Sequence, residues 1–212
     1  MIVPARTRRA GRMTKKRARD SQAFMRTGIL PQMRPAQLLD WAAWMGPCPT
    51  EVAGGKGRWR YSFANADARA CIAHVFEETL AHEDLLGTRT VLSHASSMYT
   101  LRTFDATLPA TQGWHTDYPR AQVEPLADNP GRVPLSALWS PFDGFYLVVA
   151  DLGVQSSHEA DAQSQQIWVP KGHVVVFRGD VWHGGGPHFS AYPRAHAYAV
   201  EPNFVIKDAI FA

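Results

Sequence analysis

Two histidines and one carboxylate stand in an order and spacing that could hold a metal ion. His115 and Asp117 are separated by one residue, and His183 follows much later in the chain. If residues 114–118 are extended, side chains two positions apart leave the same face of the strand, so His115 and Asp117 can bind one ion together. Two imidazoles and a carboxylate on one face of an octahedral ion leave three positions open, as oxygen chemistry at Fe(II) requires. The pattern therefore predicts a non-haem iron enzyme.

Other histidines compete for the third ligand position. Residues 82–84, His-Glu-Asp, repeat the spacing, but they fall in a stretch predicted to be helical, where residues i and i+2 point about 200° apart. His188 and His196 both follow His183. His183 is favoured because it comes directly after an apolar, strand-like run at residues 174–178 and a tight Gly-Asp turn. We expect His82 to be a surface residue of the helix.

A cation and a run of glycines follow His183. Arg194 begins a strand-like run whose position i+2 is His196. A guanidinium held in a barrel offers a planar pair of donors to a carboxylate, more specifically than lysine would. The alternative is a surface ion pair with an acid such as Glu201. Residues 184–186 are glycines, which would let backbone or a cosubstrate approach the ion closely, or would form only a flexible turn.

The elements that must position these side chains change in character near Gly87. Residues 35–45 and 67–86 have apolar residues at helical spacing. Residues 88–104 and the rest of the chain are rich in β-branched and aromatic residues between Gly, Pro and Asp turns. The predicted strands are 133–140, 145–150, 166–169, 173–178, 194–200 and 203–206, and the polar segment around His158 and Asp161 is predicted to be a loop. Helices followed by strands favour a mainly β (α+β) antiparallel barrel or jelly roll buttressed by N-terminal helices.

The charges divide the chain into a tail and a domain. Residues 1–19 hold eight of the 22 basic residues and no acid, whereas the remainder holds all 19 acidic residues. We expect residues 1–20 to be a disordered tail, and residues 6–19 could serve as a targeting signal or a nucleic-acid arm, or have no role. Residues 21–212 are predicted to form a single domain, with a helical part at 21–89 and a barrel at 90–212.

Location is inferred from what the sequence lacks. No apolar run is long enough for a membrane span, and no apolar segment follows the basic start as it would in a secretory signal. The two cysteines, Cys48 and Cys71, lack metal-ligand spacing and are expected to be free thiols. These features predict an intracellular protein, cytoplasmic or nuclear, with an organelle presequence still open.

Taken together, these motifs resemble a known family. The set His115-x-Asp117, His183 and Arg194 is similar to that of the Fe(II)/2-oxoglutarate-dependent dioxygenases, and most like the phytanoyl-CoA dioxygenase type. The stretch Pro170 to Gly186, PKGHVVVFRGDVWHGGG, is similar to the one that presents the last iron ligand in those enzymes. The resemblance spans roughly residues 90–206, and residues 1–89 match no family.

The resemblance implies a double-stranded β-helix in which His115, Asp117 and His183 bind Fe(II) and form the catalytic centre. It implies that 2-oxoglutarate chelates the iron and that Arg194 holds its far carboxylate, with O2 as cosubstrate. Substrate hydroxylation would accompany release of succinate and CO2. His196 stands where many relatives carry a Ser or Thr that also touches this carboxylate, and Tyr99 is a second candidate for that contact. A carboxylate at position 117 argues against halogenation, because related halogenases have a small residue there.

The substrate and two alternatives stay open. The aromatic residues that adjoin the proposed ligands, Trp114, Tyr118 and Trp182, could line a substrate pocket or could belong to the core. One alternative is a cupin-like metalloenzyme that uses Zn, Mn or Fe without 2-oxoglutarate. The other is a non-catalytic barrel that binds a partner and contacts nucleic acid through its tail.

Overall fold

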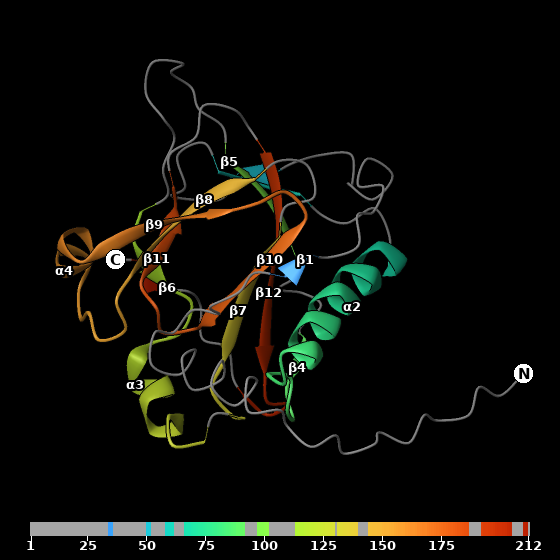
Figure 1. Ribbon diagram of the computed structural model, residues 1–212, viewed down its shortest axis with the longest axis horizontal. Coiled ribbons are helices and arrows are strands. Elements are labelled where there is room, and N and C mark those ends of the chain that lie inside the picture. Colours follow the sequence, from blue (N-terminus) through green and yellow to red (C-terminus); the bar gives the residue numbers. More distant parts are fainter. Residues whose placement is uncertain are drawn as a thin grey trace, which may run out of the picture.

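The computed structural model describes residues 34–35, 50–51, 58–61, 66–91, 97–101, 113–129, 131–139, 144–186, 192–204 and 210–211 (Figure 1). The basic tail, the predicted helix over most of 35–45, Cys48 and His188 lie outside these residues. Within the described part of the chain, no helix has the length and apolar character needed to cross a membrane.

Two antiparallel sheets make up the body of the molecule. The 8-stranded sheet has the order β1 (Arg34–Pro35), β10 (His173–Arg178), β7 (Leu135–Trp139), β12 (Tyr192–Val200), β5 (Ser97–Leu101), β3 (Arg58–Tyr61) and β2 (Thr50–Glu51), with β4 (Thr90–Val91) also paired to β12. The 5-stranded sheet has the order β13 (Ile210–Phe211), β6 (His115–Thr116), β11 (His183–Gly185), β8 (Phe145–Ala150) and β9 (Ser164–Val169). Strands distant in sequence therefore lie side by side, as in a jelly roll.

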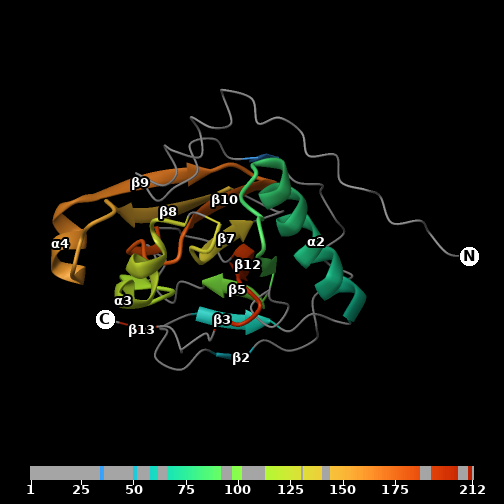
Figure 2. The ribbon, with the colours of Figure 1, turned by 90° about the horizontal axis from the view of Figure 1, so that it is seen from below.

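The helices lie outside the sheets. Figure 2 shows α2 (Ala66–His82) on one side of the molecule and α4 (Ser157–Ala162) on the opposite side. The short helices α3 (Arg120–Val123) and η2 (Glu124–Leu126) follow β6. The prediction of a loop around His158 is wrong, because Ser156 caps α4 by accepting a hydrogen bond from the Glu159 backbone N–H at 3.3 Å.

Helix α2 covers the outer face of the larger sheet. Val75, Phe76 and Leu80 pack in one buried cluster with residues of β10, β7 and β12. Val174 and Val176 of β10 belong to this cluster. The residues that alternate with them along β10 lie in a second cluster, on the inner face of the sheet. Both faces of β10 are therefore buried, which explains its unbroken apolar run. The helix stops short of residue 86 because Asp84 adopts a left-handed φ of 61° and Leu85 N–H bonds back to the Leu80 carbonyl.

The predicted strands are largely confirmed. The strands at 145–150 and 173–178 match β8 and β10 residue for residue, and β7 falls within 133–140. Strands β9 and β12 each begin two residues earlier than predicted. The strand predicted at 203–206 is wrong at its start, because Asn203 lies in a turn closed by the Phe204 N–H donating to the Glu201 carbonyl.

Candidate metal centre

Strand pairing brings the two histidines together. His115 of β6 and His183 of β11 are directly opposite partners in the antiparallel register. Side chains of directly opposite residues lie on the same face of a sheet, with Cβ atoms about 4.5–5.5 Å apart. The two imidazole rings accordingly lie with their centroids 4.3 Å apart. Register therefore unites two residues that are far apart in the sequence.

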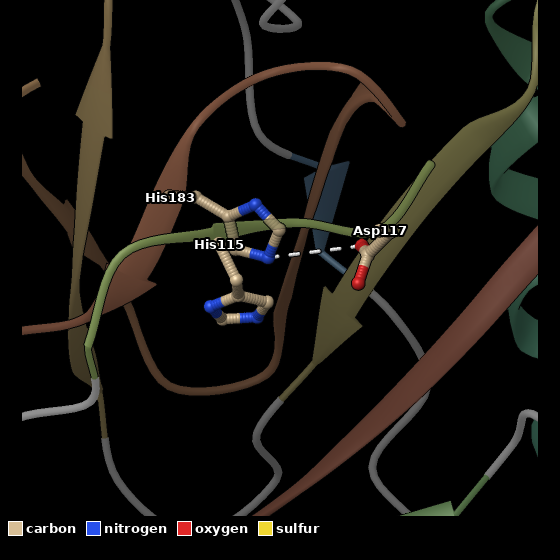
Figure 3. A group of neighbouring side chains, drawn as sticks. All are labelled: His115, Asp117 and His183. Atoms are coloured by element: carbon tan, nitrogen blue, oxygen red, sulfur yellow. Dashed lines mark ion pairs between the residues drawn. The ribbon is translucent and has the colours of Figure 1, made fainter. Parts of the chain in front are cut away.

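The third side chain follows β6 in a bend. Asp117 is held near the turn that precedes β11, because the Tyr118 N–H donates to the Gly179 carbonyl at 2.9 Å. The ligand atoms of His115, Asp117 and His183 all lie within 4.8 Å of one another. His183 Nε2 is 3.7 Å from Asp117 Oδ2, the contact drawn in Figure 3. Each of the three residues is 3% exposed, so the group is buried as a unit.

The histidines are oriented as metal ligands are. His115 Nδ1 lies 3.0 Å from the Gly113 carbonyl oxygen, and His183 Nδ1 lies 2.9 Å from that of Val181. A carbonyl can only accept, so each Nδ1 carries the proton and each Nε2 keeps its lone pair. A second ring nitrogen bonded to the backbone is the usual support of a metal-binding histidine. Two Nε2 lone pairs and one carboxylate therefore fit a divalent transition metal.

The site also favours the charge states that metal binding requires. Burial alone would raise the pKa of Asp117, but interactions with His196, His183 and His115 hold it well below its ordinary value. Burial lowers the pKa of His183 against the opposing charge of Asp117. The carboxylate is thus ionised and the imidazole neutral near neutral pH, and these are the forms that bind metals.

Three residues surround the Asp117 carboxylate. Ser136 Oγ donates to Oδ2 at 2.5 Å, and the Tyr198 hydroxyl donates to Oδ1 at 3.2 Å. His196 Nε2 lies 3.4 Å from Oδ2. Ser136 and Tyr198 are directly opposite partners on β7 and β12, so one cross-strand pair bonds both oxygens. Sequence reasoning missed both residues, although alternation along β12 places Tyr198 on the same face as His196.

Arg194 is buried inside the fold. The residue is 4% exposed, and its guanidinium carbon lies 5.8 Å from the centroid of the Phe145 ring. The alternative of a surface pair with Glu201 is wrong, because Glu201 accepts instead from Arg132 Nε at 2.8 Å. The backbone of Tyr99 on β5 lies directly opposite that of Arg194.

The tryptophans beside the ligands belong to a separate cluster. Trp114 and Trp182 are half-buried and pack against Ala150, Val154 and Ala160, next to α4. Trp114 Nε1 also donates to Asp161 Oδ1 at 2.5 Å. Because adjacent residues of a strand point to opposite faces, these indoles lie on the face away from the histidines.

Tyr118 lies in the core. It is fully buried, and its ring meets those of Tyr198 and Phe204 edge-on at 5.5 and 5.4 Å. Its hydroxyl has no hydrogen-bond partner among the described residues. Burial and the charge of Asp117 raise the pKa of this phenol. These contacts favour a packing role over contact with a substrate.

The glycines after His183 form strand rather than turn. Gly184 and Gly185 pair with Val148 and Leu147 of β8, and the Gly186 N–H donates to the Tyr146 carbonyl at 2.8 Å. A Cβ at Gly186 would lie 2.5 Å from the Tyr146 Cβ. The interpretation as a flexible turn is therefore wrong, and at Gly186 the missing side chain allows close packing of backbone on β8.

His82 and Trp139 lie away from the centre. His82 is exposed, as predicted, and its Nδ1 lies 3.1 Å from Glu83 Oε1. Trp139 is fully buried in the cluster beneath α2, on the outer face of the larger sheet.

Known structures share this fold. No protein-family model matches the chain, and no curated protein matches it in sequence. The structure is similar to SnoN, a non-heme alpha-ketoglutarate-dependent epimerase from nogalamycin biosynthesis, with a TM-score of 0.57 and 13% identity over 88% of this chain and 81% of that one. A 2OG-Fe(II) oxygenase family oxidoreductase from Burkholderia pseudomallei gives a TM-score of 0.57 and 13% identity over 95% and 96% of the two chains.

A third similar structure contains ligands. HygX from Streptomyces hygroscopicus, crystallised with nickel, 2-oxoglutarate and hygromycin B, gives a TM-score of 0.54 and 14% identity over 91% of this chain and 88% of that one. These similarities confirm the predicted jelly-roll fold, the double-stranded β-helix of the 2-oxoglutarate oxygenases.

Proposed function

We propose that the protein is an Fe(II)- and 2-oxoglutarate-dependent oxygenase that hydroxylates an organic substrate. The observation that carries this proposal is the buried group His115, Asp117 and His183, whose ligand atoms lie within 4.8 Å of one another. The group lies inside a fold that is shared with 2-oxoglutarate oxygenases, one of them crystallised with nickel and 2-oxoglutarate. The metal-binding group and the fold therefore support the same reaction class.

The three side chains would hold the iron on one face. His115 and His183 would bind through Nε2, and Asp117 through Oδ2, the oxygen nearer to His183. Three of six octahedral positions would then stay open for the cosubstrate and oxygen. Iron held there would supply the redox chemistry that couples oxidative decarboxylation of the oxo acid to oxidation of a C–H bond. In the overall reaction one oxygen atom enters succinate and the other enters the hydroxylated product, with release of CO2.

Arg194 is the proposed partner of the far carboxylate of 2-oxoglutarate. It brings a permanent positive charge into a buried position. Burial is the main cause of the lowered pKa of His183, and the charge of Arg194 is the smallest of the contributing causes. A guanidinium matches a carboxylate through two parallel hydrogen bonds. Tyr99 stays a second candidate because its backbone lies opposite that of Arg194. His196 is a weaker candidate, because it lies beside Asp117.

Binding measurements separate this function from its alternatives. We expect Ni(II), an oxygen-stable substitute for Fe(II), to bind once per chain in isothermal titration calorimetry. 2-Oxoglutarate should then bind only to the metal-loaded protein. Asp117→Ala should lose metal binding, whereas Asp128→Ala, which removes an exposed carboxylate, should not. Metal binding without 2-oxoglutarate binding would instead indicate a cupin-like metalloenzyme, and a protein that binds no metal would be a scaffold.

A further inference from the structure

The two oxygens of Asp117 have different surroundings. Oδ2 lies 3.7 Å from His183 Nε2, on the side of the metal-binding atoms. Oδ1 instead accepts the Tyr198 hydroxyl at 3.2 Å. Ser136 Oγ donates to Oδ2 at 2.5 Å and fixes the rotation of the carboxylate from the neighbouring strand. Each oxygen of the carboxylate therefore accepts a hydrogen bond from a neighbouring side chain.

The number of Asp117 oxygens that bind an ion determines how many of its coordination positions stay open. An aspartate that binds through one oxygen leaves three of six octahedral positions open, whereas one that binds through both leaves two. A chelating oxo acid takes two positions, so the two-oxygen mode would leave none for oxygen. The Tyr198 hydrogen bond opposes that mode, because it occupies a lone pair of Oδ1 and holds this oxygen toward β12, so that turning Oδ1 to the ion would weaken it.

We propose that Tyr198, with Ser136 as the second donor, is a positioning residue that keeps Asp117 bound to the metal through Oδ2 alone and so reserves a coordination position for oxygen. This inference rests on the proposed function. Neither residue would bind the metal in this arrangement, and both would act through Asp117. Their position in the fold supports the role, because Ser136 and Tyr198 are opposite partners of adjacent strands and Ser136 is fully buried.

The same chain offers a matched control. Tyr118 directly follows Asp117 and packs edge-on against Tyr198 at 5.5 Å. Its hydroxyl has no hydrogen-bond partner within the part of the chain that the structure describes. Tyr118→Phe therefore removes a phenolic oxygen from the same neighbourhood without removing a bond to Asp117. Tyr198→Phe makes the identical chemical change and removes the bond to Oδ1.

The test separates metal and 2-oxoglutarate binding from access of oxygen to the iron, for which nitric oxide is the stable probe. For Tyr198→Phe we expect Ni(II) affinity to be kept or raised and 2-oxoglutarate affinity of the Ni(II)-loaded protein to be kept. The affinity of the Fe(II)- and 2-oxoglutarate-loaded protein for nitric oxide should fall about tenfold or more, the size of effect seen for other residues that support metal ligands. For Tyr118→Phe all three affinities should match those of the unaltered protein. Ser136→Ala, which frees Oδ2 to rotate, should weaken Ni(II) binding about tenfold.

The outcomes distinguish this inference from the proposed function. If the unaltered protein binds Ni(II) and 2-oxoglutarate and Tyr198→Phe binds nitric oxide equally well when loaded with Fe(II) and 2-oxoglutarate, the positioning role is refuted while the proposed function stands. Equal losses of all three affinities in Tyr198→Phe would also refute it, because they would indicate general damage to the site. If the unaltered protein does not bind 2-oxoglutarate, the proposed function itself fails.

Discussion

Replacing Gly179 by alanine should disturb the centre through steric contact alone. A Cβ at this position would lie 2.2 Å from Tyr118 Cδ2, and ordinary contacts begin near 3.4 Å, so one of the two groups must move by about 1.2 Å. The backbone is held on both sides, because the Gly179 N–H donates to the Pro134 carbonyl and the Gly179 carbonyl accepts from Tyr118, each at 2.9 Å. The Tyr118 ring is fully buried against Tyr198 and Phe204. Neither group can move without losing contacts.

The expected cost follows from overpacking in a closed core. Forcing one extra carbon into a well-packed interior costs about 1–3 kcal/mol of the free energy of unfolding. For a chain of this length each kcal/mol lowers the melting temperature by about 2–4 °C, so the expected fall is roughly 2–12 °C. Because Tyr118 directly follows Asp117, Ni(II) affinity should fall as well.

The assay compares two glycines in thermal unfolding followed by circular dichroism. Gly113→Ala is the matched control, since a Cβ there would meet no atom of the described residues within 4 Å. It also keeps the backbone carbonyl that His115 Nδ1 contacts. Gly113→Ala should melt at or slightly above the temperature of the unaltered protein, because alanine lowers the entropy of the unfolded chain. A Gly179→Ala protein that melts with the control would refute the packing argument.

Three further predictions concern the ionisable residues of the site. Asp117→Ala should abolish succinate formation while the circular dichroism spectrum stays that of a folded protein, and retained turnover would contradict the ligand assignment. Arg194→Ala should weaken 2-oxoglutarate binding to the Ni(II)-loaded protein about a hundredfold, since charge-assisted hydrogen bonds contribute about 1.5–3 kcal/mol; an unchanged affinity would move the cosubstrate site elsewhere. Burial lowers the pKa of His183 below its ordinary 6.5, so the unfolded chain takes up this proton first as the pH falls, and the metal-free protein should lose stability below about pH 6.5. Melting temperatures between about pH 7.5 and 5.5 should fall less steeply for His183→Gln, and parallel curves would contradict the assignment.

The sequence predicted the metal-binding residues where the pattern that identifies them lies within a few residues of one another. The spacing of His115 and Asp117 carries its own geometry, because residues two apart in an extended segment share a face. His183 could be chosen because it follows an unbroken apolar run that the structure buries on both faces of β10. Residues near one another in sequence thus revealed ligands that strand pairing later brings together.

The surroundings of Asp117 could not be predicted in the same way. Ser136 reaches Asp117 only because β7 pairs with β12 in a register that sets it opposite Tyr198. Register is a property of the assembled sheet, and a shift by one residue would turn both side chains to the other face. The family resemblance assigned His196 to the cosubstrate, yet the structure places it 3.4 Å from Asp117 Oδ2.

The sequence left two interpretations of the glycines after His183 open for a related reason. Residues 184–186 look like a flexible turn because glycine has little preference for strands. In the structure Gly184 and Gly185 lie in β11, and Gly186 fits against Tyr146 where a Cβ would collide. Such a contact depends on a neighbouring strand that is distant in sequence, so composition alone could not decide between close approach and a flexible turn.

The most direct test of the central claim follows the cosubstrate through one turnover. Fe(II) and 2-oxoglutarate are added to the protein without oxygen, and the visible charge-transfer band of an iron-chelated oxo acid is recorded. The solution is then exposed to oxygen, and succinate is quantified against the iron added. We predict a band that requires both iron and the oxo acid, that is absent in Asp117→Ala, and that decays with formation of succinate. Iron binding without the band, or a band that persists in oxygen with no succinate formed, would contradict the assignment as a 2-oxoglutarate-dependent oxygenase.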